Sequence, residues 1–306
     1  GPARNRHYAR YAKADFQDMP IEPVADDVLR RITGPWVTLE AMDFEIGARD
    51  AWNSFLYAAI RMQGDRESYA NFLSQNTIVD DGVGRVLETL RRKGLLENTL
   101  IVYSADQGNH FGQHGIWGHS NFFEPTRLYD TATRIPLIVR SPDRETAGRV
   151  DETMIGQYDL MPTLLAALGA SGHADPRSPG RDFSPLFRNE TLAKWGEAVF
   201  FEQEETRGIR TPDHLYWQRH PELGRNALFD LRTDPGQRRD VADDPAYAKA
   251  RKNLDRQVTA FFEHNSDARF DLWKGGEVKG LALSPWKWKK VHGEQWGQPS
   301  SQPAEN

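Results

Sequence analysis

The chain has 306 residues, 38% of them hydrophobic and 27% charged, so it can bury a large core in one large domain plus a smaller one, or in two of middling size. A net charge of -5 gives no electrostatic reason to expect a nucleic acid or an anionic membrane as partner, and no apolar run approaches the roughly 18 residues of a membrane span. The absence of cysteine excludes disulfides, zinc–thiolate sites and a cysteine nucleophile within these residues.

The first long element that the sequence predicts is a helix over residues 65–92. Before it, Pro20 and Pro23 indicate an extended segment that wraps a surface formed by something else. Apolar residues then recur at three- and four-residue spacings, with Asp65 suited to cap the start and Gly94 just beyond the end. The pattern therefore predicts an amphipathic helix that leads directly into a strand.

The segment from residue 98 to residue 142 holds the main candidate site. Apolar runs at residues 99–103 and 135–140 predict two short buried strands with a long polar segment between them, and the first run, which follows the helix directly, is expected to be a parallel strand of an α/β fold. Ligands bind beyond the carboxyl ends of such strands. Asp106 and Gln107, which follow the first run, are therefore candidate ligands of a hard cation, and the alternative is a polar turn.

The rest of the chain predicts a second, smaller unit. A short strand at residues 150–155 and a helix at residues 159–169 precede a Gly- and Pro-rich loop that marks a boundary. We therefore divide the chain into an α/β core, residues 1–188, and a C-terminal subdomain, residues 189–306.

Short strands predict a small antiparallel sheet in this subdomain, at residues 198–202, 208–211, 215–218 and 227–231. A final helix over residues 246–262 follows. The tail from residue 270 to residue 296 carries four tryptophans, which are expected to pack on the body without regular structure.

Several short motifs, each weak alone, together resemble the sulfatase family. Their order along residues 65–262 is collinear with the family: Asp80-Asp81-Gly82, Asp106-Gln107-Gly108, Gly112-Gln113-His114-Gly115, Tyr129-Asp130, Arg134-Ile135-Pro136, Asp159-Leu160-Met161-Pro162-Thr163 and Leu228-Phe229-Asp230-Leu231. The resemblance implies an alkaline-phosphatase-like fold, which has a mostly parallel sheet sandwiched by helices and a small C-terminal antiparallel sheet plus helix.

The resemblance also implies hydrolysis of a sulfate ester, on a small molecule or a carbohydrate, at a site that holds one divalent cation. Asp106 and Gln107 match the later pair of metal ligands in the family. Carboxylate and amide oxygens suit Ca²⁺, or alternatively Mg²⁺, better than zinc.

One departure from the family concerns the nucleophile. The family uses a formylglycine made from Cys or Ser in an N-terminal motif, and no residue of this chain stands in such a motif. The N-terminal aspartates of the metal site are also unmatched. The resemblance therefore implies the C-terminal portion of a sulfatase, with the N-terminal portion missing and the formylglycine expected upstream. The sequence indicates no compartment.

The position of the family's sulfate-binding cation is open between two residues. Many members have a Lys after a Trp-Gly turn, where this chain has His119. Counting back from Tyr129-Asp130 leads instead to the neighbourhood of Arg127. His119 is the first choice, and only its protonated form brings a full charge.

Two further residues have open roles. His114 either lines the pocket or is a loop histidine bonded to backbone. Arg210 lies on the predicted C-terminal sheet, where exposure to solvent is the expected state.

Two alternatives to a sulfatase stay open. The same superfamily includes phosphonate monoester and phosphodiester hydrolases, and nothing in the sequence separates sulfate from phosphate. The other alternative is a catalytically incomplete fragment with no activity alone, which exposes an apolar sheet edge.

Overall fold

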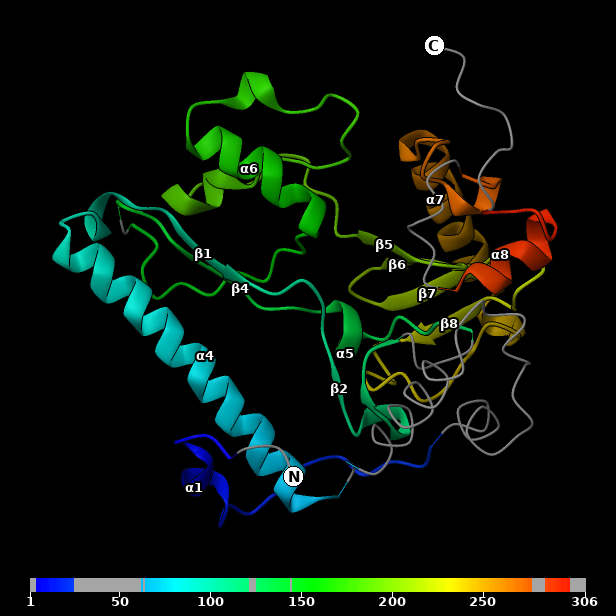
Figure 1. Ribbon diagram of the computed structural model, residues 1–306. Coiled ribbons are helices and arrows are strands. Elements are labelled where there is room, and N and C mark those ends of the chain that lie inside the picture. Colours follow the sequence, from blue (N-terminus) through cyan, green and yellow to red (C-terminus); the bar gives the residue numbers. More distant parts are fainter. Residues whose placement is uncertain are drawn as a thin grey trace.

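The computed structural model describes residues 4–24, 62, 64–120, 125–143, 145–276 and 284–297. These residues form a mixed α/β structure whose C-terminal part contains a four-stranded antiparallel sheet followed by helices (Figure 1). Its helices and strands, in chain order, are α1 (Tyr8–Tyr11), α4 (Arg66–Arg92), β1 (Ile101–Ser104), β2 (His110–Phe111), β3 (Trp117–Gly118), α5 (Asp130–Thr133), β4 (Leu137–Arg140), α6 (Leu160–Ala167), β5 (Val199–Gln203), β6 (Thr206–Arg210), β7 (His214–Arg219), β8 (Ala227–Asp230), α7 (Ala248–Asn265) and α8 (Pro285–His292). Among the described residues, no helix has both the length and the apolar character needed to cross a membrane.

The predicted long helix is confirmed as α4. Its N-cap Asp65 accepts hydrogen bonds from the backbone N–H groups of Glu67 and Ser68, as a capping carboxylate does. Its first half packs on the protein, whereas Val79 and Val86 farther along are 54% and 59% exposed. The helix therefore buries only part of its apolar stripe within the described structure.

The two predicted strands beside the candidate site exist, but they are partly exposed rather than buried, and the expected parallel pairing of the first strand is not seen among the described residues. β1 and β4 pair antiparallel, with Ile101 opposite Arg140 and Ser104 opposite Leu137. Parallel neighbours need a crossover of a dozen or more residues, usually a helix. The connection from β1 to β4 instead contains the β2–β3 hairpin and the four-residue α5. The mostly parallel sheet is therefore not seen in the described residues.

The predicted C-terminal sheet is confirmed in the order β5-β6-β7-β8, all antiparallel. One face, with Tyr216 and Leu228, packs on Leu254 and Val258 of α7. The other face, with Leu215, Trp217 and Phe229, packs on a buried group from the loop between β1 and β4, namely Ile116, Leu128 and Tyr129. The sheet therefore acts as a rigid backing for that loop.

Two expectations about the connecting segments are corrected. Residues 150–155 form no strand. The tryptophan tail does pack on the body, where Trp288 is fully buried, but it does so through the regular helix α8. Pro285 in the first turn of α8 is a helix-start signal that the tail's composition obscured.

The turn before α6 is fixed by one buried carboxylate. Asp159 is fully buried and accepts hydrogen bonds from the N–H groups of Gly156 (2.9 Å) and Arg181 (2.8 Å). Asp159 thus joins the start of α6 to the loop at residues 170–188. The division of the chain at residue 188 stays a prediction.

Candidate functional site

The candidate site is the polar loop that leaves β1. Asp106 is exposed at its start, and its carboxylate accepts the N–H of Gln107 (2.9 Å). The side-chain amide of Gln157 donates to the carbonyls of Ala105 (2.9 Å) and Asp106 (3.0 Å). The carboxyl end of β1 is therefore held against the turn that precedes α6, with the Asp106 side chain facing solvent.

Two of the predicted site residues come together here. The Gln107 Nε2 atom lies 3.2 Å from Nδ1 and 3.3 Å from Nε2 of His119, and the tautomer decides which ring nitrogen takes part. His119 directly follows β3, so the β2–β3 hairpin returns it to the end of β1. The structure thus places a candidate metal ligand beside the first-choice cation.

Gly108 fixes where these side chains sit. Its N–H donates to the carbonyl of Ala132 (2.9 Å), which brings the loop against α5. A Cβ atom at this position would lie 2.3 Å from the backbone oxygen of Thr131. Only glycine allows this approach without movement of the backbone.

His114 is part of an aromatic stack. Its backbone has a positive φ of 56°, and its ring lies flat on Tyr129 with the centroids 3.5 Å apart. Burial lowers the pKa of His114 to about 3, with smaller contributions from the charges of His110, Arg238 and Arg127. His114 is therefore neutral at pH 7 and brings no charge to a sulfate.

His110 supports the same wall. Its ring is fully buried and meets the ring of His114 at 89°, and its Nδ1 lies 2.8 Å from the hydroxyl of Thr131. Burial lowers its pKa to about 3 as well. His110 therefore shapes the loop from within.

Arg127, the other candidate cation, directly follows Thr126, whose backbone N–H and carbonyl are both hydrogen-bonded. The N–H of Thr126 donates to Glu205 Oε1 (2.6 Å), and its carbonyl accepts from the hydroxyl of Thr206 (3.0 Å). Glu205 in turn pairs with Lys287 of α8 at 2.9 Å, and both side chains are buried. Sequence reasoning missed this pair because its members are 82 residues apart and share no motif.

The prediction that Arg210 is exposed to solvent is wrong. It is half-buried and forms an ion pair with Asp130 at the start of α5 (3.1 Å). The Asp130 N–H donates to the side chain of Gln237 (2.8 Å). The C-terminal sheet therefore holds α5, and through it the Gly108 contact, rather than presenting Arg210 to solvent.

The donor set suits part of a hard-cation site. Asp106 and Gln107 offer adjacent carboxylate and amide oxygens, the ligand types that Ca²⁺ and Mg²⁺ prefer. Within the described ranges no three His, Cys, Asp or Glu side chains gather in a way that could hold a metal. Because Ca²⁺ takes about six to eight oxygens, these two residues fit as one side of a coordination sphere.

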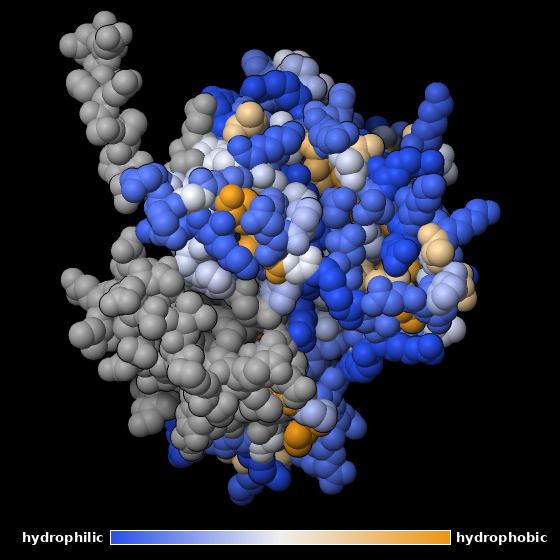
Figure 2. Space-filling model, turned by 90° about the vertical axis from the view of Figure 1, so that its right-hand side faces the viewer, coloured by the Kyte–Doolittle hydropathy of each residue, from blue (hydrophilic) through white to orange (hydrophobic). Residues whose placement is uncertain are grey.

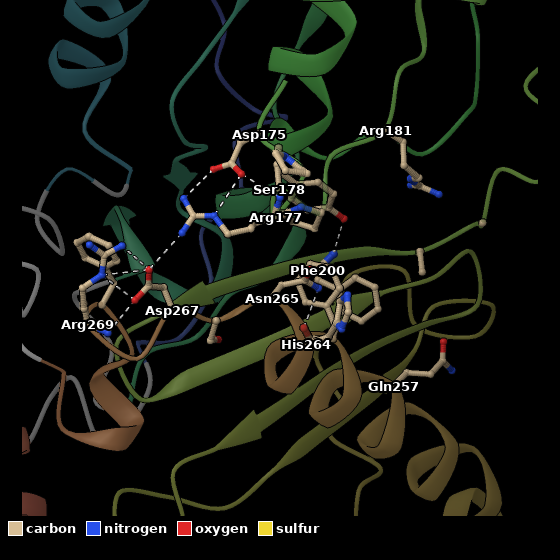
Figure 3. A pocket seen from close by; sticks show the side chains of 18 residues that line it. Asp175, Arg177, Ser178, Arg181, Phe200, Gln257, His264, Asn265, Asp267 and Arg269 are labelled. Carbon is tan, nitrogen blue, oxygen red and sulfur yellow. Dashed lines mark hydrogen bonds and ion pairs between the residues drawn. The ribbon is translucent and has the colours of Figure 1, made fainter. Parts of the chain in front are cut away.

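A cavity of about 990 Å³ opens elsewhere, between residues 175–181 and the end of α7 (Figure 3). Its lining includes none of Asp106, Gln107, His114, His119 or Arg127. It is therefore distinct from the candidate site, although Tyr158 of its wall is next to Gln157, which holds the end of β1.

Comparison with known protein families gives two matches. The sulfatase family model matches residues 5–170, more than half of the chain. A model described as N-sulphoglucosamine sulphohydrolase, C-terminal, matches residues 118–264. Together the two models extend over both the candidate site and the C-terminal sheet.

Characterised relatives are similar over part of their length. An N-acetylglucosamine-6-O-sulfatase of Bacteroides thetaiotaomicron is 30% identical over 195 residues, which cover 60% of this chain and 34% of the relative. A choline-sulfatase of Rhizobium meliloti is 26% identical over 219 residues, with 68% and 38% covered. The chain thus spans little more than a third of the length of these two relatives.

Solved structures share the fold. A phosphonate monoester hydrolase from Silicibacter pomeroyi gives a TM-score of 0.63 at 24% identity, covering 85% of this chain and 52% of that one. A protein solved in complex with its substrate D-glucosamine-2-N,6-O-disulfate gives 0.59 at 22% identity, with 86% and 60% covered.

Proposed function

The chain belongs to the sulfatase family, and from that premise we propose that it forms one wall of the active site of a sulfate-ester hydrolase. The observation that carries the proposal is the meeting of Gln107 with His119 beside Asp106 at the carboxyl end of β1. This arrangement brings oxygen donors for a cation and a group able to carry positive charge to one point of an exposed loop.

Each residue of this wall has a distinct task in the proposal. Asp106 and Gln107 hold one divalent cation, Ca²⁺ or Mg²⁺, which when bound neutralises charge on the sulfate oxygens. His119 donates a hydrogen bond to the same oxygens from the ring nitrogen that does not accept from Gln107, at the place where negative charge develops as the ester bond breaks. Arg127 is the second candidate for that donor, in a position set by the Thr126–Glu205 contact.

The nucleophile does not fit any residue of this chain. The sequence has no cysteine, and no serine stands in the family's nucleophile motif, so we assign no catalytic step to formylglycine here. In this proposal the nucleophile and the remaining metal ligands come from residues outside these 306. The isolated chain is then expected to lack sulfatase turnover.

The proteins to which the chain is similar suggest the substrate class that we propose. They include an N-acetylglucosamine-6-O-sulfatase and a choline-sulfatase, so we propose a sulfated carbohydrate or a small-molecule sulfate ester as substrate. The second candidate is phosphonate or phosphate diester hydrolysis. It is favoured by the similarity to a multifunctional alkaline phosphatase superfamily protein of Trinickia caryophylli, 26% identical over 202 residues.

Parallel assays separate the two functions. The protein that contains this chain together with a nucleophile segment is given an aryl sulfate, an aryl phosphodiester and an aryl phosphonate at matched concentrations. We expect a higher kcat/KM for the sulfate. A preference for the phosphodiester or phosphonate supports the second candidate, and no turnover of any of the three, with the formylglycine verified by mass spectrometry, contradicts both.

A further inference from the structure

The 990 Å³ cavity between residues 175–181 and the end of α7 has no role in the chemistry proposed above. Its volume lies near the upper end of the range for small-ligand sites, about 300–1,000 Å³. It is built where the chain passes from the α6 region to the C-terminal sheet, so both parts contribute walls (Figure 3).

The floor of the cavity is aromatic. Phe200 of β5 and Phe261 of α7 stack in parallel, with centroids 4.0 Å apart and planes within 7°. Tyr158 leans on Phe261 at 5.9 Å, and its hydroxyl accepts the N–H of Phe200 (3.2 Å). The hydrogen bond between Tyr158 and Phe200 fixes the three rings relative to β5. The rings therefore form a fixed apolar surface on which a flat ligand face can pack.

Arginines flank this floor. In Figure 3 Arg177 and Arg269 lie on one side of Phe200, and Arg181 lies on the other. Arg177 donates two hydrogen bonds to Asp175 (3.3 and 3.1 Å) and also approaches Asp267 at 4.0 Å, whereas Arg269 hydrogen-bonds to Asp267. The lining residues include three arginines and two aspartates, Asp175 and Asp267, and the carboxylate beside the third arginine is the fully buried Asp159 behind the wall.

The guanidinium of Arg181 has hydrogen-bond donors that the described residues do not use. Its guanidinium lies 3.9 Å over the ring of Trp195, which fixes its plane. Its nearest carboxylate, Asp159, is 3.6 Å away and already accepts two backbone N–H groups. In the described part of the chain the guanidinium makes no hydrogen bond, so its donors are open to a ligand.

Neutral hydrogen-bonding groups complete the lining. Gln257 and His264, both on α7, are among the residues that line the cavity. Neither side chain forms a hydrogen bond with another described residue. Their amide and imidazole groups are suited to hydroxyl groups, which both donate and accept.

We propose that this cavity is a non-catalytic binding site for an acidic oligosaccharide, with sugar rings on the Phe200–Phe261 floor and acidic groups at Arg177 and Arg181. Apolar ring faces, several hydroxyls and separated sulfate or carboxylate groups are the features that such a ligand combines. A compact anion would engage only one end, and a neutral sugar would leave the arginines unused. The proposal does not depend on the catalytic function proposed above.

The test is calorimetric titration of the 306-residue chain at low ionic strength. One probe is a disaccharide with a sulfate group on each ring, and the other is the same disaccharide without sulfate. We expect the disulfated probe to bind and the neutral probe to bind at least tenfold more weakly, because the neutral probe lacks the charge-assisted hydrogen bonds between arginine and sulfate.

Three substitutions locate the site. Arg177→Gln and Arg181→Gln are each expected to weaken binding of the disulfated probe about tenfold. Arg188→Gln is the matched control, because Arg188 pairs with Glu190 two residues away, as Arg177 pairs with Asp175. Circular dichroism verifies that each variant is folded.

Several results would overturn the proposal. Equal weakening by Arg188→Gln would mean that the probe binds by non-specific charge attraction. Equal binding of the neutral probe would show that the site does not require acidic groups on its ligand. Loss of binding in Asp106→Ala with no change in Arg177→Gln and Arg181→Gln would place the probe in the candidate active site. No detectable binding of the disulfated probe would also contradict the proposal.

Discussion

Single backbone contacts set the geometry of the loop that leaves β1. The N–H of Gly108 reaches the carbonyl of Ala132, and the carbonyl of Asp106 receives the amide of Gln157. Neither contact involves the parts of Asp106 and Gln107 that would bind a cation. The loop can therefore hold its shape while its oxygen donors stay open to solvent and ligand.

Glycine at position 108 leads to a prediction with an internal control. In Gly108→Ala the new methyl group would meet the Thr131 oxygen at 2.3 Å, so we expect unfolding free energy to fall by about 1–3 kcal/mol. Gly84→Ala, within α4 and with nothing within 4 Å of the new methyl group, should raise it by about 0.5–1 kcal/mol. Urea titration measures both, and a Gly108→Ala protein as stable as the parent would contradict the close approach.

His114 predicts a pH dependence. Its pKa is about 3 when folded against an ordinary value of 6.5, so between these values the unfolded chain binds a proton that the folded protein does not. Stability should therefore fall as pH falls through this window, by up to about 1.4 kcal/mol per pH unit from this group. In His114→Asn, where Asn tolerates the positive φ, the loss between about pH 7 and about pH 5 should be smaller by up to about 2 kcal/mol. An unchanged loss, measured by urea unfolding, would show that His114 is not buried neutral.

At the scale of elements, the turn between β5 and β6 joins two segments that are distant in the sequence. Glu205 receives the N–H of Thr126 and pairs with Lys287, while Glu204 accepts the indole N–H of Trp288 (2.7 Å). The turn thus connects the segment that carries Arg127 to α8. Buried carboxylates with this many partners fix relative positions, because a lost partner leaves an uncompensated charge.

The buried pair is tested by removing one charge. Lys287→Met is expected to lower the unfolding free energy by about 3–5 kcal/mol, because it leaves the Glu205 carboxylate buried without its cation. Lys290→Met, on the exposed side of the same helix, should change it by less than about 0.5 kcal/mol. The double variant Glu205→Gln, Lys287→Met should recover part of the loss. Equal stability of Lys287→Met and Lys290→Met would show that the Glu205–Lys287 pair does not stabilise the folded protein.

At the scale of the whole molecule, apolar exposure is uneven. Exposed large hydrophobic residues recur on α4, β1 and β4, namely Ile78, Val79, Val86, Tyr103, Leu137 and Ile138. These elements lie on the left of Figure 1, whereas the opposite face in Figure 2 is mostly hydrophilic apart from the residues drawn in grey. Half of these exposed residues lie on the helix α4 and half on the two-stranded sheet, so the predicted exposure of an apolar sheet edge stays a prediction.

Local patterns predicted most elements but not their partners. The cap at Asp65 and the alternating strands of the C-terminal sheet are encoded within a few residues, so the sequence was sufficient for them. The antiparallel pairing of β1 with β4 depends on the path of more than thirty residues between them, which no local pattern describes. Contacts such as Arg210–Asp130 and Glu205–Lys287 join residues about 80 positions apart and became visible only in three dimensions.

The most direct test of the central claim is the metal content of an Asp106→Ala protein, in the context that contains the nucleophile segment. We expect bound Ca²⁺ or Mg²⁺, measured by elemental analysis after dialysis, to be lost together with turnover of an aryl sulfate. The control Asp143→Ala removes an exposed carboxylate that likewise accepts a nearby backbone N–H, and should retain both. Unchanged metal content and turnover in Asp106→Ala would show that the end of β1 is not a wall of the active site.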